Sequence, residues 1–301
     1  MSHSELRSDF NSVNVVVTTP FSEDGQHVNH EALAENVRFL REAGIRLYIP
    51  CGGTSEYSSL TDEERVNVVA TTVDAVDGAG SVVAGVGGAL KEALELVAEY
   101  EAVGADGIMV NPATHGSSHD ALVEYYRTIA NETDLGVMLY KTDSAISNDI
   151  LAEVGELENI LAIKYSDDVT DLTHTYDTLP ENLVADLEWV NGRAEMHAVS
   201  FGLEGAHGFT TGIGNFVPEI CLDLVEATKN GEWDRARQIR EVVRPYQELR
   251  GEAGSIAAVK YGQELAGVTG GPVRIPRRGE MDQEHKDRAN SYYESIMSAT
   301  Y

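Results

Sequence analysis

The feature that most constrains the fold is an alternation of short apolar runs and amphipathic segments over roughly the first three quarters of the chain. Most of the apolar runs are continuous stretches of Val, Ile and Leu, which is typical of parallel strands covered on both faces. The predicted strands are Val13–Thr18, Arg46–Pro50, Ser81–Val86, Asp106–Val110, Leu135–Tyr140, Ile160–Lys164, Leu183–Leu187 and Gly205–Thr211. We therefore expect a parallel sheet whose strands are joined by helices.

The segments between these runs carry helix signals. Glu31–Ala43 places its apolar residues on one stripe and is followed by Gly44, a plausible helix-ending glycine. Thr61–Glu64 has the residue spacing of a capping box, and Ala89–Val103 and His119–Ile129 are also amphipathic. Eight strands, each followed by a helix, predict an α/β fold of the (β/α)8 TIM barrel type. A doubly wound open sheet shows the same alternation, so periodicity alone leaves both open.

The pattern changes after residue 225. Gly231–Leu249, Ala253–Ala266 and Met281–Met297 predict three helices with no strand between them. We expect residues 1–225 to form the barrel and residues 226–301 to form a C-terminal helical extension. The extension should pack on the barrel within the same structural domain.

The charge of the chain restricts its partners. Fifty Asp and Glu residues against 22 Lys and Arg residues give a formal net charge of −28, and the acidic residues are spread along the whole chain. Such a surface repels phosphates, so we expect neither a nucleic acid nor a membrane as partner. A dispersed acidic excess is typical of halophilic proteins, because salt screens the self-repulsion.

Other sequence features indicate a soluble protein of the cytoplasm. The chain contains no apolar run near the roughly 18 residues of a membrane-spanning helix. Its N-terminus lacks the basic and apolar regions of a secretion signal. Cys51 and Cys221 are too few for a disulfide framework. We therefore expect a cytoplasmic location.

In a (β/α)8 barrel the reactive side chains come from the carboxyl ends of the strands. Lys164 ends the sixth predicted strand and Tyr140 ends the fifth. Lys164 alone could be a lysine whose stem packs on apolar surface while its ammonium reaches water. In a desolvated pocket its neutral amine could instead add to a keto group, and Tyr140 could relay the protons.

Polar loops follow two other predicted strands. The loop Gly52–Ser55 contains Gly53, Thr54 and Ser55, whose backbone N–H groups and hydroxyls suit a carboxylate. Thr211 ends the eighth predicted strand and Asn215 follows it, and each could either contact a substrate or hold loop backbone. No stretch resembles a metal site, a phosphate-binding loop or a dinucleotide fingerprint, so we expect no metal and no cofactor.

Taken together, these residues resemble the dihydrodipicolinate synthase / N-acetylneuraminate lyase superfamily over nearly the whole chain. The matching motifs are TTPF at 18–21, GGTSE at 52–56, Tyr140, Lys164, and Gly205-x-x-Gly208 followed by Asn215. The resemblance implies a Schiff-base TIM barrel, commonly a homotetramer, that acts on a small-molecule 2-keto acid. It implies Lys164 as the imine-forming residue, Tyr140 as its proton relay, and Gly53 and Thr54 as binders of the substrate carboxylate.

Longer stretches resemble one branch of this superfamily, the 5-keto-4-deoxyglucarate dehydratases and their relatives acting on 2-keto-3-deoxypentonates. These stretches are GGTSEYSSLTDEE, LYKTDSAIS, IKYSDDVTD, GNFVP and AVKYGQELAGVTGGPVRIP. The resemblance implies a lyase that dehydrates a 2-keto-3-deoxy sugar acid toward 2,5-dioxopentanoate. The alternatives are a pyruvate-dependent class I aldolase acting on such acids and a non-catalytic barrel that binds them.

Two departures from the superfamily bear on the substrate. Gly53 stands where many members have the first of two threonines, which argues against a dihydrodipicolinate synthase. The dehydratase branch usually has an Asn-Arg pair after its tyrosine, where this chain has Lys141 and Thr142, so the contact to a distal carboxylate is open. The acid that protonates the leaving hydroxyl is open too, with Asp143, Asp167 and Asp168 as candidates or as solvated charges.

Overall fold

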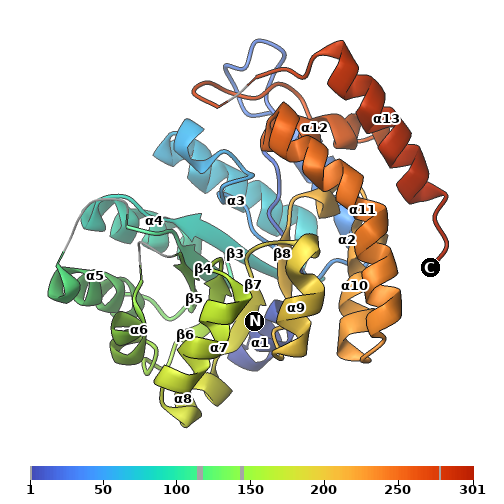
Figure 1. Ribbon diagram of the computed structural model, residues 1–301. Helices are drawn as coiled ribbons and strands as arrows, with labels where there is room; N and C mark the ends of the chain where they lie inside the picture. Colours follow the sequence, from blue (N-terminus) through green and yellow to red (C-terminus); the bar gives the residue numbers. More distant parts are fainter. Residues whose placement is uncertain (1, 114–117, 143–145, 278) are drawn as a thin grey trace.

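The computed structural model describes residues 2–113, 118–142, 146–277 and 279–301, which form a closed barrel of parallel strands ringed by helices (Figure 1). Neighbouring strands follow chain order, and β1 pairs with both β2 and β8. The strands are β1 (Val13–Val15), β2 (Leu47–Tyr48), β3 (Ser81–Val86), β4 (Gly107–Val110), β5 (Gly136–Lys141), β6 (Ile160–Tyr165), β7 (Glu188–Asn191) and β8 (Phe209–Thr211). The predicted TIM barrel is confirmed, and the open sheet is excluded.

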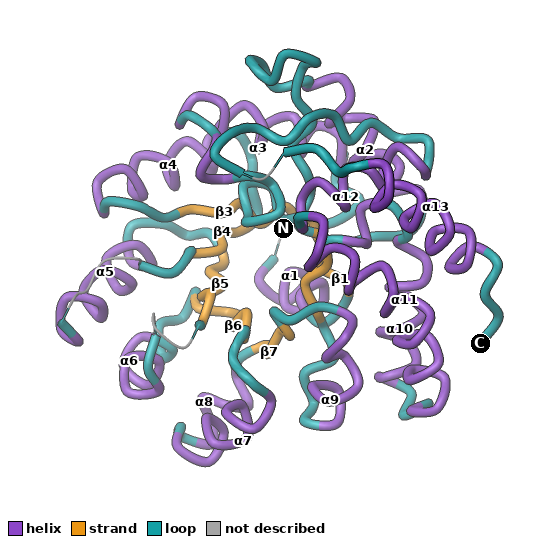
Figure 2. The backbone as a smooth tube through the Cα atoms, turned by 45° about the horizontal axis from the view of Figure 1, so that its top comes forward, coloured by secondary structure: helices purple, strands orange, loops and turns teal. Residues whose placement is uncertain are grey.

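The helices surround the strands in a ring that Figure 2 shows close to end-on. Their apolar stripes face the barrel, and polar signals define their ends: Thr61 Oγ1 accepts a hydrogen bond of 3.2 Å from the Glu64 N–H in the predicted capping box. The ring helices are α2 (His30–Glu42), α3 (Asp62–Val76), α4 (Leu90–Ala102), α5 (His119–Asn131), α6 (Asn148–Val154), α7 (Val169–Thr178), α8 (Glu181–Asp186), α9 (Ala198–Leu203) and α10 (Pro218–Lys229).

A short N-terminal helix, α1 (His3–Phe10), packs against the interior of the barrel (Figure 2). Leu6 and Phe10 are buried among the interior residues Val16, Leu47, Ile49, Val83, Met109, Met138, Leu161, Ala162 and Val190. Gly136 admits this helix, because a Cβ there would lie 2.5 Å from Leu6 Cδ2. The helix covers the end of the barrel at which the strands begin, so the opposite end is the one available for a site.

The sequence prediction of the seventh strand was wrong. Leu183–Leu187 lies mainly in helix α8, and β7 follows directly as Glu188–Asn191. Leu183 and Leu187 are both buried and lie four residues apart, which is the spacing of one helix face. The short apolar run that contains them therefore belongs to a helix and not to a strand. Trp189 and Val190 supply the buried residues of the strand instead. The carboxyl end of this strand therefore lies at Asn191.

The C-terminal region consists of α11 (Trp233–Ala253), α12 (Ser255–Leu265) and α13 (Gln283–Met297), as predicted. These helices lie together beside α10 (Figure 1). Arg274, after α12, donates hydrogen bonds to the Glu64 carboxylate at 2.7 and 2.9 Å. Lys260 of α12 forms an ion pair of 2.6 Å with Glu56, in the loop after β2. These contacts hold the C-terminal region against the end of the barrel at which the strands terminate.

The helices of the described ranges are too short or too polar to serve as membrane spans.

Candidate active site

Lys164 and Tyr140 occupy opposed positions on adjacent strands. The pairing of β5 with β6 places the two Cα atoms in register, and Lys164 Nζ lies 3.9 Å from the centroid of the Tyr140 ring. The Lys164 side chain is 6% exposed, although it stands near the open end of the barrel. The strand pairing thus holds an amine against a phenol ring.

Burial changes the acid–base chemistry of this lysine. It lowers the pKa of Lys164 to about 8, because the ammonium form loses its hydration. No carboxylate in the described ranges forms a salt bridge with Lys164 to offset that loss. About a tenth of the amine is therefore neutral at pH 7, against less than roughly one part in a thousand for an ordinary lysine.

Lys164 and Tyr140 line a cavity of about 290 Å³ at the carboxyl ends of the strands. Cavities that bind small molecules typically measure about 300–1,000 Å³, so this one suits a small metabolite. The other lining residues are Val16, Gly53, Thr54, Gly192, Ala194, Thr210, Thr211, Gly212, Arg250, Ser255, Ile256 and Arg277. An amine, a phenol, hydroxyls and guanidinium groups therefore share one cavity.

The loop after β2 contributes Gly53 and Thr54 to the lining. Within the described ranges the backbone N–H groups of these two residues donate to no acceptor of the protein, so both remain available to a ligand. Ser55 lies behind the loop: its hydroxyl donates to the Ile49 carbonyl at 3.2 Å, and its own carbonyl accepts from the Thr19 hydroxyl at 2.8 Å. Gly53 and Thr54 thus form the surface that a carboxylate can approach.

Thr211, the last residue of β8, and Asn215, in the loop after it, have their polar atoms engaged within the protein. Thr211 lines the cavity, and its hydroxyl donates to Glu195 and accepts from the Gly214 N–H at 2.8 Å. Asn215 holds the backbone, accepting from the Thr18 N–H at 3.2 Å and donating to the Val16 carbonyl at 2.9 Å. The structure therefore brings Lys164, Tyr140, Gly53, Thr54 and Thr211 to one cavity, but neither Ser55 nor Asn215.

The sequence analysis named five of the fourteen lining residues as site candidates, and those it missed include Gly192, Ala194, Arg250, Ser255 and Arg277. Gly192 follows the true end of β7, so correct placement of that strand would have revealed it. A Cβ at Gly192 would lie 3.2 Å from Lys164 Cγ and 3.0 Å from the Tyr165 carbonyl oxygen. Arg250, Ser255 and Arg277 come from the C-terminal region, where local sequence carried no signal for a site.

Two of the three candidate acids are described by the structure, and both lie outside the cavity. Asp143 is outside the described residues. Asp167 is buried in a close ion pair with Lys141, whose Nζ also lies 4.7 Å from the centroid of the Tyr165 ring. Asp168 caps α7 by accepting from the Thr170 N–H at 3.1 Å, a bond that lowers its pKa. Neither Asp167 nor Asp168 lines the cavity.

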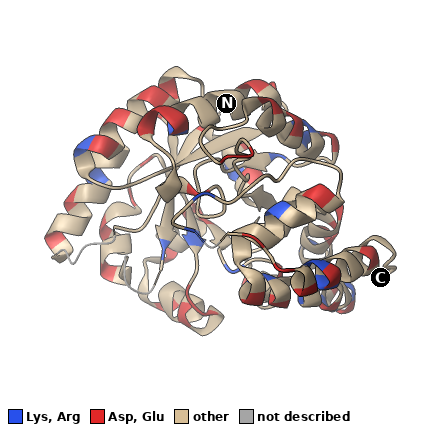
Figure 3. Ribbon diagram, turned by 90° about the horizontal axis from the view of Figure 1, so that it is seen from above, with Lys and Arg blue, Asp and Glu red and all other residues tan. Residues whose placement is uncertain are grey.

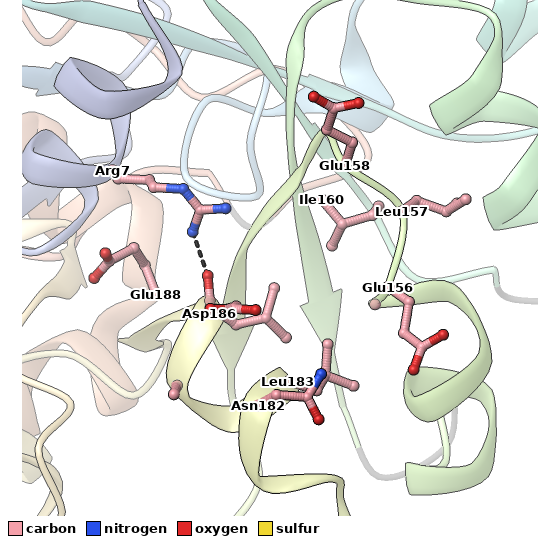
Figure 4. A pocket seen from close by; sticks show the side chains of 12 residues that line it. Arg7, Glu156, Leu157, Glu158, Ile160, Asn182, Leu183, Asp186 and Glu188 are labelled. Carbon is pink, nitrogen blue, oxygen red and sulfur yellow. Dashed lines mark hydrogen bonds between the residues drawn. The ribbon is translucent and has the colours of Figure 1, made fainter.

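A larger hollow of about 740 Å³ lies at the other end of the barrel, where β6 and β7 begin (Figure 4). Arg7 of α1 points into it and donates to the Asp186 carbonyl. Its charged lining is otherwise acidic, with Glu156, Glu158 and Glu188. In the described part of the chain no three His, Cys, Asp or Glu side chains gather closely enough to hold a metal ion. The cavity at Lys164 is therefore the stronger candidate site.

The sequence model of the Dihydrodipicolinate synthetase family matches residues 9–295. The chain belongs to this family. A probable 5-dehydro-4-deoxyglucarate dehydratase of Bacillus licheniformis is 30% identical over 98% of this chain and 97% of that protein. An uncharacterized DapA-like lyase of Halobacterium salinarum is 32% identical over 89% of this chain and 88% of its own.

Solved structures of this family share the fold. The crystal structure of dihydrodipicolinate synthase from Oceanobacillus iheyensis superposes with a TM-score of 0.92 at 28% identity, covering 99% of this chain and 100% of that one. The corresponding enzyme of Bacillus clausii gives a TM-score of 0.91 at 29% identity over 97% and 99% of the two chains. The predicted family membership is confirmed, and the chain is a lyase of the dihydrodipicolinate synthetase family.

Proposed function

We propose that this protein forms a Schiff base through Lys164 and dehydrates a 2-keto-3-deoxy sugar acid, either a 2-keto-3-deoxypentonate or 5-keto-4-deoxyglucarate, toward 2,5-dioxopentanoate. The observation that carries the proposal is the buried Lys164 amine, which lies 3.9 Å from the centroid of the Tyr140 ring inside a cavity. Its pKa of about 8 supplies neutral amine near neutral pH. A protein that only bound sugar acids would need no such amine.

In the proposed reaction the Lys164 amine adds to the keto carbon at position 2, and the carbinolamine loses water to give an iminium. The iminium draws electrons from position 3, so a proton leaves there and an enamine forms. The enamine electrons then expel the hydroxyl at position 4, which departs as water after taking up a proton. The carbon at position 5 then loses a proton in a pentonate, or its carboxylate as carbon dioxide in 5-keto-4-deoxyglucarate, which leaves an enol at positions 4 and 5. Protonation at position 3 and tautomerisation of this enol give the aldehyde. Hydrolysis of the iminium finally releases 2,5-dioxopentanoate and the amine.

Two further groups support these steps. In the described ranges the Tyr140 hydroxyl donates no hydrogen bond to the protein, so it is free to carry protons between the substrate and the amine. Gly53 and Thr54 offer backbone N–H groups and a hydroxyl to the carboxylate beside the keto group. We assign Ser55 and Asn215 to holding the loops, because their hydrogen bonds go to the protein.

The test is borohydride trapping with pyruvate and with 2-keto-3-deoxy acids, followed by mass analysis of the peptides. We expect reduced adducts on Lys164. If no 2-keto acid labels this residue, the mechanism is wrong.

Product analysis separates the proposed dehydratase from an aldolase. An aldolase releases pyruvate from a 2-keto-3-deoxy acid, whereas a dehydratase yields a dioxo acid and no pyruvate. The relatives named as probable dehydratases favour the second outcome.

We also propose a homotetramer that works in the cytoplasm of an organism adapted to high salt. The family resemblance supports the tetramer. The net charge of −28 supports the high-salt environment, and Figure 3 shows Asp and Glu along most of the helices. Sedimentation of the protein in molar potassium chloride and in dilute buffer tests both points, since the assembly should be retained only at high salt.

A further inference from the structure

The charges that line the active-site cavity are opposite in sign to those of the rest of the molecule. The chain carries a net charge of −28, yet the cavity is lined by three cationic side chains, Lys164, Arg250 and Arg277, and by no Asp or Glu. One substrate carboxylate has a place at the loop of Gly53 and Thr54, and the Lys164 amine reacts in its neutral form. Two guanidinium groups are then left over in the same cavity.

The Arg250 guanidinium is held in place by hydrogen bonds to neighbouring side chains. Its Nη1 donates to Gln247 Oε1 at 2.7 Å, and its Nη2 donates to Ser255 Oγ at 2.9 Å. The guanidinium lies against the backbone at the end of β8, since a Cβ at Gly212 would be 2.5 Å from Nη2. Its Nε is buried and has no hydrogen-bond partner in the described structure.

Among the described residues Arg250 makes no direct ion pair, although the buried Glu195 acts on its charge from beyond Gln247. Gln247 stands between Arg250 and the buried Glu195, because its amide also donates to the Glu195 carboxylate. Burial raises the pKa of Glu195 and lowers that of Arg250, although a guanidinium stays charged near neutral pH. No carboxylate of the described ranges forms a salt bridge with Arg250. The network thus orients the guanidinium, and Glu195 offsets its charge only through Gln247 and not by direct contact.

Lys141, directly after the site tyrosine, cannot take this role. Its ammonium is buried in the ion pair with Asp167 and does not line the cavity. A cation for a distal group of the substrate must therefore come from another element, and α11 supplies it.

We propose that Arg250, assisted by Arg277, binds a second carboxylate and thereby selects a 2-keto-3-deoxy dicarboxylate over a monocarboxylate of the pentonate type. This inference rests on the proposed function for the position of the first carboxylate. The planar guanidinium matches a carboxylate with forked hydrogen bonds, and Nη1 and Nη2 each carry a second N–H beyond the one that Gln247 or Ser255 accepts. Arg277 is exposed, so its contribution is the smaller one.

The experiment compares two probes of equal chain length, 2-oxoadipate and 2-oxohexanoate, which differ by the terminal carboxylate. Their affinities for the full-length protein are measured by calorimetry without borohydride, so the result does not depend on imine reduction. We expect 2-oxoadipate to bind roughly 10- to 100-fold more tightly, as one charge-assisted contact allows. Arg250→Gln should remove this preference, while Arg250→Lys should retain only part of it.

Arg244→Gln is the matched control, because Arg244 lies on the same helix and pairs with Glu241 on the surface. This variant should keep the wild-type preference. Arg277→Gln should reduce the preference by a few-fold only. Equal affinities of the two probes in the wild-type protein, or a preference that survives in Arg250→Gln, would overturn the proposal.

Borohydride trapping of pyruvate on the same variants separates this inference from the proposed function. In Arg250→Gln, pyruvate and borohydride should still label Lys164, because pyruvate has no second carboxylate. Labelling that fails in the wild-type protein while 2-oxoadipate remains preferred would refute the Schiff-base mechanism and leave the dicarboxylate site standing.

Discussion

Lys164 and Tyr140 are paired residue to residue between β6 and β5, with the Lys164 Nζ 3.9 Å from the centre of the Tyr140 ring. Because the two positions share the hydrogen-bonded register of a closed barrel, their Cα atoms are fixed side by side, and burial of Lys164 confines its side chain. The strand pairing therefore sets the distance between the amine and the phenol, and substitutions at and around this pair should have separable effects.

Lys164→Met should abolish labelling by pyruvate and borohydride, because it keeps an apolar stem and removes the nucleophile. Turnover should fall by about 1,000-fold or more, the scale lost when a covalent route is removed. Lys91→Met is the control, since Lys91 is exposed on α4 and pairs only with Glu95 in the described structure. Turnover retained in Lys164→Met would require another nucleophile.

The rate of imine formation should depend on pH through the Lys164 amine. Its pKa is lowered to about 8, and the neutral form is the nucleophile, so the rate should rise about tenfold per pH unit below 8 and level off above it. Stopped-flow measurement of pyruvate binding checks this. A rate that keeps rising to pH 10 would mean that the amine has the pKa of an ordinary lysine.

Tyr140→Phe should slow turnover by about 100- to 10,000-fold, the usual contribution of a positioned proton donor. The ring stays in place against Lys164, so trapping with pyruvate should still reach completion, but more slowly. Tyr261→Phe removes a hydroxyl that donates to Asn290 at 3.1 Å, away from the cavity, and should leave both rates unchanged. If Tyr140→Phe turned over at the wild-type rate, the proton relay would lie elsewhere.

Gly192→Ala should impair imine formation through packing alone. The new Cβ would lie 3.2 Å from Lys164 Cγ and 2.0 Å from Ser166 Oγ, so the lysine stem and the neighbouring serine must shift. We expect a loss of about 10- to 100-fold in the trapping rate, since a misplacement of an ångström is costly in catalysis. Gly251→Ala, where nothing lies within 4 Å of the added Cβ, is the control for a glycine-to-alanine change.

Lys260→Met should destabilise the protein by about 3–5 kcal/mol, because it leaves the buried Glu56 carboxylate without its cation. The double variant with Glu56→Gln should lose less than the sum of the two single changes. Urea unfolding measures both values. Additive losses would show that the pair does not act as a unit.

Much of the barrel could be predicted from the sequence, because strand and helix periodicities are local properties. The capping box at Thr61 and the strand ends at Tyr140 and Lys164 need only a few neighbouring residues to be recognised. The prediction of the seventh strand was wrong because Leu183 and Leu187 have the spacing of one helix face, although so short an apolar run is also typical of a strand. Local pattern cannot decide between the two when a run is this short.

The candidate site was only partly predictable for a different reason. The positions of Lys164 and Tyr140 on their strands follow from sequence order, because parallel strands bring their carboxyl ends to one edge. Sequence order cannot show that Ser55 and Asn215 direct their side chains to the backbone, or that Arg250 of α11 lies against Gly212. The sequence by itself determined the barrel and the strand-end positions of Lys164 and Tyr140, through local periodicity. Only the tertiary structure decided that Arg250 and Arg277 line the same cavity as Lys164 and Tyr140. Packing between elements far apart in the chain leaves no local pattern in the sequence.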